Sequence, residues 1–204
     1  MTTIEYLQDA YESFNKELFN NELPKLPNIL ITISRKNRAY GYFAPSAFKN
    51  STDEVHEIAL TPASLSRTTL ESLSTLLHEM VHCWQQVYGK PGRNGYHNKQ
   101  WANKMKDVGL KPFSILDSKL ETGFKCSHEI VPNSVFTDLA EVFTKQFGDI
   151  QLQTNYFVPT NNKVTVKKRP VVKCQCGSFT VPFGVNLKIT CITCGDEVEI
   201  SDEI

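Results

Sequence analysis

The chain lacks several features that would assign it to a particular class of protein. Its 204 residues contain no stretch of eighteen consecutive apolar residues, so the sequence predicts no membrane span. The first residues, 1–5, have neither the basic nor the apolar part of a secretory signal peptide. Without an export signal, the six cysteines indicate a reducing, cytoplasmic environment, where cysteine binds metal or stays a free thiol rather than forming disulfides.

The chain also lacks an excess of charge of either sign. Its 22 basic residues are balanced by 22 acidic ones, which argues against a nucleic-acid-binding surface over the whole chain. The distribution is uneven, because residues 151–195 hold six basic residues and no acidic one, and residues 90–111 hold six basic residues with Asp107 alone. Phe179 and Phe183 lie in the first interval and can stack on exposed bases. A solvated surface with core aromatics explains the same pattern. The candidate DNA contacts among the basic residues are Lys167, Lys168 and Arg169.

Histidine is scarce, yet two of the five histidines form a metal-binding motif. The run His78-Glu79-Met80-Val81-His82 is H-E-x-x-H. Apolar residues recur at spacings of three and four from Leu70 to Tyr88, which predicts a helix. Residues four apart share one helix face, so the two histidines can bind one Zn²⁺ while Glu79 acts as general base on a metal-bound water. The alternative is a solvated helix with two incidental histidines.

A catalytic zinc site needs a third protein ligand and one open position. His97 follows a glycine-rich turn, residues 92–97, and precedes a second predicted helix with Trp101, Met105 and Val108 on one face. This position at the start of a helix favours His97 as the third ligand. The spacing alone leaves three alternatives, which are Glu121, Glu129 and His128.

Four cysteines near the C-terminal end form a second candidate metal site. Cys174 and Cys176 make a C-x-C pair, and Cys191 and Cys194 make a C-x-x-C pair, each followed by glycine. This pattern is typical of a zinc ribbon, although such ribbons usually carry two C-x-x-C pairs. A module of this size forms little core without a metal, which favours a structural Zn²⁺. The alternative is a β-hairpin with four unliganded cysteines. The remaining two cysteines, Cys83 and Cys126, are interpreted as core residues.

The predicted fold class is α+β, with a small β-sheet and packed helices followed by a small C-terminal β ribbon. Helical spacing predicts an N-terminal helix to about residue 20, and β-rich runs predict strands at 28–34, 39–43 and 55–60. The motif helix, the His97 helix and a helix at 135–147 capped by Ser134 follow. The predicted domains are 1–150 and 171–204, joined by a polar linker at 151–170.

Several of these segments together resemble the SprT-like family of zinc metalloproteases, which includes the DNA-dependent protease Spartan. The resemblance spans nearly the whole chain, and its motifs keep their order. The matching segments are 39–43 (AYGYF), 56–60 (HEIAL), 76–82 (LLHEMVH), 95–101 (GYHNKQW), 122–130 (TGFKCSHEI) and the cysteine module. The resemblance implies a zincin-like protease domain in which His78, His82 and His97 bind zinc and Glu79 is the catalytic base.

The resemblance also implies a function, which is zinc-dependent cleavage of DNA-bound or crosslinked proteins with single-stranded DNA as a partner. It would place the protein at the nucleoid in a prokaryote or phage and in the nucleus in a eukaryote. His128, Tyr96 and Arg93 are candidates for stabilising the oxyanion or contacting substrate. Two other functions stay open: a DNA-binding adaptor with an idle protease centre, and a protease that acts on a dedicated protein partner without DNA.

Overall fold

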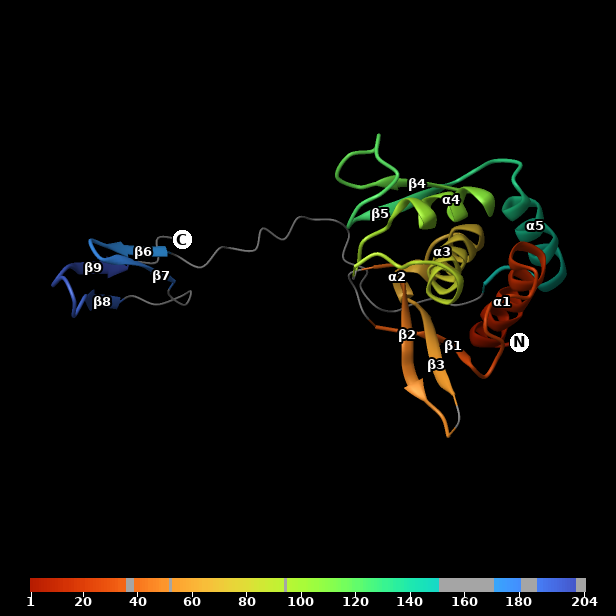
Figure 1. The fold of residues 1–204 in the computed structure, drawn as a ribbon, viewed down its shortest axis with the longest axis horizontal. Coiled ribbons are helices and arrows are strands. Elements are labelled where there is room, and N and C mark those ends of the chain that lie inside the picture. Colours follow the sequence, from red (N-terminus) through yellow and green to blue (C-terminus); the bar gives the residue numbers. More distant parts are fainter. Residues whose placement is uncertain (36–38, 52, 94, 151–170, 181–186, 201–204) are drawn as a thin grey trace. The chain divides into compact units, whose positions relative to one another are not determined.

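The structure is a computed structural model that describes residues 1–35, 39–51, 53–93, 95–150, 171–180 and 187–200 (Figure 1). The chain divides into two compact units, Met1–Val158 and Pro159–Ile204, and each is described by itself. The candidate DNA contacts Lys167, Lys168, Arg169 and Phe183 lie outside the described residues, and so does the side chain of Phe179.

The first unit is built around one long helix that carries the H-E-x-x-H motif. This helix, α3, contacts the helices α1, α2, α4 and α5 and the strands β2 and β3, and Figure 1 shows it between the sheet and the other helices. The elements of this unit are α1 (Thr3–Phe19), β1 (Ile29–Ile33), β2 (Gly41–Lys49), β3 (Glu54–Leu60), α2 (Pro62–Leu65), α3 (Thr69–Tyr88), α4 (Lys99–Asp107), β4 (Leu110–Ser114), β5 (Cys126–Ile130) and α5 (Val135–Phe147).

The three strands predicted near the N-terminus form one sheet in the order β1-β3-β2. Strand β1 runs parallel to β3, with Ile31 opposite Ile58, and β2 runs antiparallel to β3, with Phe43 also opposite Ile58. Strand β2 is longer than predicted and continues to Lys49. Its first residues lie against α3, which brings the backbone of this strand to the motif.

The helix ends follow the capping chemistry of the sequence. Thr68 caps α3 and forms a capping box with Glu71, while Ser134 caps α5. Leu70 and Tyr88 were expected on the apolar face of α3, but they are 38% and 53% exposed. Both lie in the end turns of the helix, where the core no longer covers the side chains, and the Tyr88 hydroxyl donates to a backbone oxygen instead.

A second sheet that the sequence pattern did not predict lies after α4. Strands β4 and β5 pair antiparallel, with Leu110 opposite Ile130 and Pro112 opposite His128. Pro112 lacks the N–H that a strand ladder uses, so its residue type does not indicate the strand in which it lies. The hairpin is part of the candidate site because strand β5 places His128 next to His78 on α3.

The core of the first unit is rich in aromatic side chains. The ring of Phe14 on α1 meets that of Phe136 on α5 edge to face, with 5.8 Å between ring centroids, and Tyr6 meets Phe143 in the same way at 5.2 Å. Trp101 on α4 is fully buried and extends this core toward the histidines of α3. Aromatic rings thus join α1 to α5, and the Trp101 ring contacts the histidines of α3.

The described residues of the second unit, 171–180 and 187–200, form two antiparallel hairpins, whose strands are β6 (Val171–Cys174), β7 (Gly177–Thr180), β8 (Leu187–Thr190) and β9 (Glu197–Ile200). Each hairpin presents one cysteine pair, an arrangement that fits a zinc ribbon. The described residues as a whole form a mixed α and β fold with small sheets and five helices.

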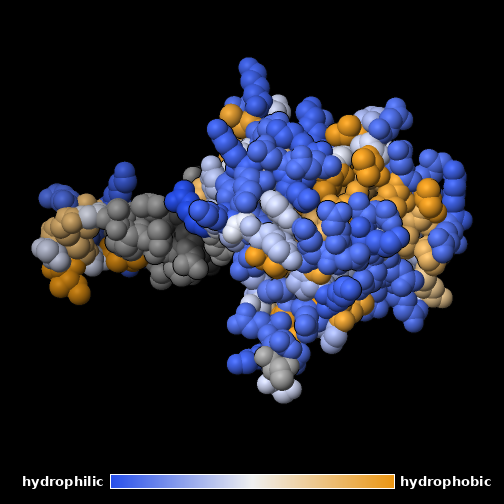
Figure 2. Space-filling view, turned by 45° about the vertical axis from the view of Figure 1, so that its right-hand side comes forward, coloured by the Kyte–Doolittle hydropathy of each residue, from blue (hydrophilic) through white to orange (hydrophobic). Residues whose placement is uncertain are grey.

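Hydrophilic residues cover most of the face of the first unit that Figure 2 shows, and apolar residues gather there in smaller areas. Among the described residues, none of the helices combines the length and the apolar character needed to cross a membrane.

Candidate metal centre

Three histidines meet at one point in the first unit, two from helix α3 and one from the turn before α4. His78 and His82 lie one turn apart on α3, and His97 immediately precedes α4; each offers a ring nitrogen, and these atoms lie within 4.8 Å of one another. The structure thus brings His97 to the motif as predicted. The alternatives Glu121 and Glu129 lie in surface ion pairs, with Lys106 at 2.8 Å and Lys111 at 3.2 Å.

A polar network fixes the base of the glycine-rich turn that carries His97. The buried Gln85 on α3 donates to the Asn98 side chain at 2.7 Å, and Asn98 donates to the backbone oxygen of Lys90 at 2.8 Å. The N–H of Lys90 in turn donates to Gln100 at 2.7 Å. Because both ends of the turn are tied to α3 and α4, His97 is held where the two helices meet.

The spacing of the imidazole nitrogens fits a metal ion. His82 Nε2 and His97 Nε2 are 3.2 Å apart, while His97 Nδ1 lies 3.1 Å from the carbonyl oxygen of Gly123. A carbonyl oxygen only accepts, so Nδ1 carries the proton and Nε2 presents its lone pair to His82. Two nitrogen ligands of a tetrahedral Zn²⁺ are about 3.3 Å apart, given Zn–N bonds of roughly 2.0–2.1 Å. The donor set therefore suits Zn²⁺.

The buried indole of Trp101 forms an apolar wall beside the three histidines. Its ring centroid lies 4.3 Å from that of His97, 5.0 Å from His78 and 5.4 Å from His82. Burial, with a smaller contribution from His97, lowers the pKa of His82 to about 3. Burial likewise holds the pKa of His78 well below its ordinary value. At neutral pH these histidines are uncharged, which is the form that binds a metal.

His128 joins the cluster from strand β5. Its Nδ1 lies 3.0 Å from His78 Nδ1, and its Nε2 lies 3.0 Å from the hydroxyl oxygen of Ser74. Burial and the neighbouring Arg67 lower the pKa of His128 to about 4. His128 was a candidate oxyanion stabiliser, and the structure engages both of its ring nitrogens within the protein. Ser74 was missed in the sequence, although it precedes His78 by one helical turn and so shares its face.

Glu79 lies next to the histidines and faces strand β2. Its side chain is buried, and burial raises its pKa to about 8, partly offset by a hydrogen bond from the backbone of Phe43. Strand β2 approaches this closely because it begins with glycine. A Cβ at Gly41 would lie 3.2 Å from Glu79 Cγ and 3.0 Å from Thr75 Cγ2. This contact explains the glycine in the AYGYF segment, to which the sequence alone assigned no role.

The other two candidate substrate residues gather around Phe124. The Tyr96 ring meets the Phe124 ring edge to face at 5.2 Å, and the Arg93 guanidinium lies 4.7 Å above it. Phe124 is half exposed and follows Gly123, which pairs with His97. Tyr96 and Arg93 thus form a surface cluster around Phe124, next to the Gly123 that pairs with His97. Their role in stabilising the oxyanion or contacting substrate stays a prediction.

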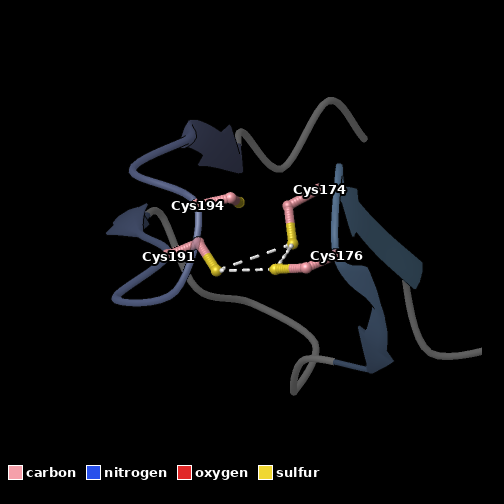
Figure 3. A group of neighbouring side chains, drawn as sticks. All are labelled: Cys174, Cys176, Cys191 and Cys194. Atoms are coloured by element: carbon pink, nitrogen blue, oxygen red, sulfur yellow. Dashed lines mark hydrogen bonds between the residues drawn. The ribbon is translucent and has the colours of Figure 1, made fainter.

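The second candidate site consists of the four cysteines of the second unit, whose side chains point toward one another (Figure 3). The sulfur of Cys176 lies 3.4 Å from that of Cys174 and 3.3 Å from that of Cys191. Thiolates around one tetrahedral Zn²⁺ lie about 3.8 Å apart, so this cluster fits the ion after a small expansion. The C-x-C spacing therefore still brings both sulfurs into the group. A hydrogen bond from the backbone of Cys194 is the largest effect that lowers the pKa of Cys191, to about 6.

Comparison with known proteins identifies the family. Residues 7–121 match the model of the SprT-like family, which is more than half of the chain, and the chain belongs to this family of metallopeptidase-like proteins. A Salmonella typhimurium protein described as an uncharacterized protein in the mucB 3′ region is 52% identical over 40 residues. That match covers 20% of this chain and 50% of the relative, so the chain spans about half the relative's length. No solved structure matches the chain.

The lowered histidine pKa values predict that the metal-free chain loses stability in mild acid. Unfolded histidines titrate at their ordinary pKa of 6.5, whereas the folded pKa is about 3 for His82 and about 4 for His128. The pKa values of His78 and His97 are also lowered. Below 6.5 the unfolded chain therefore binds more protons than the folded chain, and the free energy of unfolding falls as the pH falls. Glu79 has the opposite effect on the free energy of unfolding, because its pKa of about 8 in the folded chain exceeds the ordinary value of 4.5. It is a single group, whereas four histidines of the cluster have lowered pKa values.

The measurement is the melting temperature of the chelated protein at about pH 7.5 and about pH 5.5, which should be lower at the more acidic pH. A variant with both His82→Asn and His128→Asn should show a shallower pH dependence. A wild-type melting temperature that stays constant or rises on acidification would contradict burial of these rings in the neutral form.

Proposed function

We propose that the chain is a zinc-dependent endopeptidase that hydrolyses peptide bonds in protein substrates. The observation that carries the proposal is the convergence of three neutral imidazole nitrogens within 4.8 Å, directly beside a buried carboxyl group on the same helix. Membership of the SprT-like family supports the same class of activity. Three protein ligands and a neighbouring base leave the fourth position of a tetrahedral ion open, as hydrolytic zinc sites require.

The residues have separate tasks in this proposal. His78, His82 and His97 would hold Zn²⁺, which would polarise the substrate carbonyl and lower the pKa of a water toward neutrality. Glu79 takes a proton from the attacking water onto a carboxylate oxygen and returns it to the departing amine nitrogen. In the metal-free pocket the raised pKa keeps this carboxyl largely protonated at neutral pH, and a nearby cation would lower the pKa so that the carboxylate form can accept the proton.

The four cysteines would hold a second, structural Zn²⁺, because the two hairpins of the second unit are short and offer little apolar surface to stabilise them. The backbone N–H of Gly195 already closes the knuckle by donating to the Cys191 oxygen at 2.8 Å. This site would shape the ribbon and leave the peptide chemistry to the histidine centre.

Metal analysis tests both sites. The wild type should contain two zinc ions per chain, His97→Ala one, and the double variant Cys191→Ser with Cys194→Ser also one. The matched control is His56→Ala, which should retain two, because His56 lies on β3 and its Nδ1 accepts from the Ser46 backbone instead. Elemental analysis after removal of loosely bound metal gives the counts. Equal zinc in His97→Ala and wild type would contradict the histidine site.

Substitution of the base tests catalysis separately from metal binding. Glu79→Gln keeps the size of the side chain but cannot accept the proton, so casein hydrolysis should fall by at least about 100-fold while the zinc count stays unchanged. The control is Glu129→Gln, which removes an exposed carboxylate paired with Lys111 and should leave the rate near wild type. A Glu79→Gln variant with nearly wild-type turnover would show that another group is the base.

DNA association is a further part of the proposal, and the charge distribution supports it. Residues 151–195 contain six basic residues and no acidic one, and the family resemblance points in the same direction. Several of the described lysines in the two basic intervals already have acidic partners, since Lys106 pairs with Glu121, Lys111 with Glu129 and Lys188 with Glu197. The proposal places the contact on Lys167, Lys168 and Arg169, which are three consecutive basic residues.

Binding to fluorescent single-stranded DNA tests this part. Binding should be detectable at low salt and should weaken steeply as salt rises, because phosphate contacts release counterions. Changing Lys167, Lys168 and Arg169 together to Glu should reduce both DNA binding and DNA-stimulated casein hydrolysis without changing the zinc count. Hydrolysis that is zinc-dependent but unaffected by DNA would favour a protease directed by protein contacts, and DNA binding without hydrolysis would favour an adaptor with an idle centre.

A further inference from the structure

We infer that residues 123–128, named here the orienting segment, fix the tautomers of two of the three histidine ligands, and that His128 is the positioning residue for His78. The segment follows β4 in the chain and includes the first residues of strand β5, which begins at Cys126. At its start the Gly123 oxygen contacts His97, and at its end His128 contacts His78. The inference rests on the proposed metal site, because it concerns how its ligands are presented.

The hydrogen bonds from His78 outward form a chain whose direction is set at the far end. The Ser74 hydroxyl donates its only proton to the backbone oxygen of Glu71, at 2.8 Å. A carbonyl oxygen has no proton to give, so this last bond has one possible direction. The Ser74 oxygen must therefore accept from its other partner, His128 Nε2, at 3.0 Å. His128 consequently carries its proton on Nε2.

The same reasoning continues to the metal ligand. A neutral imidazole has one N–H donor and one acceptor nitrogen, so His128 Nδ1 is an acceptor. His78 Nδ1 lies 3.0 Å away and must donate to it. The proton of His78 is then on Nδ1, and the lone pair on Nε2 is the one available to a metal. The backbone carbonyl of Glu71, at the far end of this hydrogen-bond chain, thus decides which nitrogen of His78 can bind a metal.

The orienting segment also fixes the tautomer of His97, through Gly123. The orienting segment pairs with His97 through two backbone hydrogen bonds, from His97 N to Gly123 O at 2.8 Å and from Gly123 N to His97 O at 3.0 Å. The same Gly123 oxygen accepts from His97 Nδ1 at 3.1 Å, which leaves His97 Nε2 as the acceptor. His78 and His97 therefore have the same tautomer for two different reasons, one side-chain partner and one main-chain partner.

A metal-binding histidine commonly donates its second ring N–H to a carboxylate, a carbonyl or water. His97 follows this pattern, whereas His78 has another histidine as its acceptor. This partner makes His128 part of the ligand's support rather than a ligand or an oxyanion donor: its Nδ1 faces a ring nitrogen of His78, and its only N–H is directed at Ser74.

The direct test is the tautomer of each ring in the metal-free, full-length wild type near neutral pH. Long-range proton–nitrogen NMR correlations should show protons on Nδ1 of His78 and His97 and on Nε2 of His128. A His78 ring protonated on Nε2, or a His128 ring protonated on Nδ1, would overturn the inference. The measurement needs neither zinc nor a substrate, so its result is independent of whether the chain is a peptidase.

The second test is zinc affinity of the histidine centre, measured by chelator competition in the full chain carrying Cys191→Ser and Cys194→Ser. His128→Leu removes the acceptor and should weaken zinc binding by about 10- to 100-fold. His128→Asn restores an acceptor oxygen near the position of Nδ1 and should recover most of the affinity. Ser74→Ala removes the group that directs His128 and should produce a smaller loss than His128→Leu. His56→Leu is the control and should match the parent.

The outcomes separate the possible roles of His128. An affinity unchanged in His128→Leu would overturn the positioning role. Equal losses in His128→Leu and His128→Asn would also overturn it, because a directly coordinating ring cannot be replaced by the amide. The melting temperature of each metal-free variant shows whether it folds. If the parent binds no zinc at the histidines, the proposed function fails, and the tautomer measurement still decides the inference.

Discussion

Two imidazole nitrogens, His82 Nε2 and His97 Nε2, are held 3.2 Å apart, and the rest of the site depends on this contact. His97 Nε2 presents a lone pair there, which can accept a hydrogen bond from His82 or bind a cation. The helical repeat places His78 and His82 on one face, and the paired backbones of His97 and Gly123 bring the third ring to them. Trp101 blocks the space into which the rings could turn. The helices, the glycine-rich turn and the β4–β5 hairpin all contact this one cluster, so a cation bound by the histidines would also stabilise their packing.

The same burial acts in opposite directions on the two kinds of titratable group. It lowers the pKa values of the histidines and raises that of Glu79, so at neutral pH the metal-free pocket is nearly free of charge. A pocket without charge can be buried without a large desolvation cost. It is also prepared for a divalent cation, because the histidine lone pairs are available and Glu79 can release its proton once the positive charge arrives.

The sequence predicted the parts of this site that follow a short-range rule. The helical spacing from Leu70 to Tyr88 and the four-residue spacing of the two histidines are both local, and both agree with the structure, in which α3 spans Thr69–Tyr88. The role of His128 is not local, because it depends on a hairpin that carries Pro112 opposite the histidine and that no alternating pattern revealed. Gly41 was visible as part of a motif, but its contact with Glu79 joins elements 38 positions apart and needs the sheet to be known.

The match to the SprT-like family ends at residue 121, just before Gly123 and His128. A fragment cut at that boundary would keep all three histidines and Glu79, yet it would lose the acceptors for His97 and His78. It would also lose α5, whose Phe136 and Phe143 pack on α1. Domain boundaries for recombinant expression of such chains should therefore extend at least through α5. A shorter piece contains the H-E-x-x-H motif but lacks the residues that orient its histidines and pack its core.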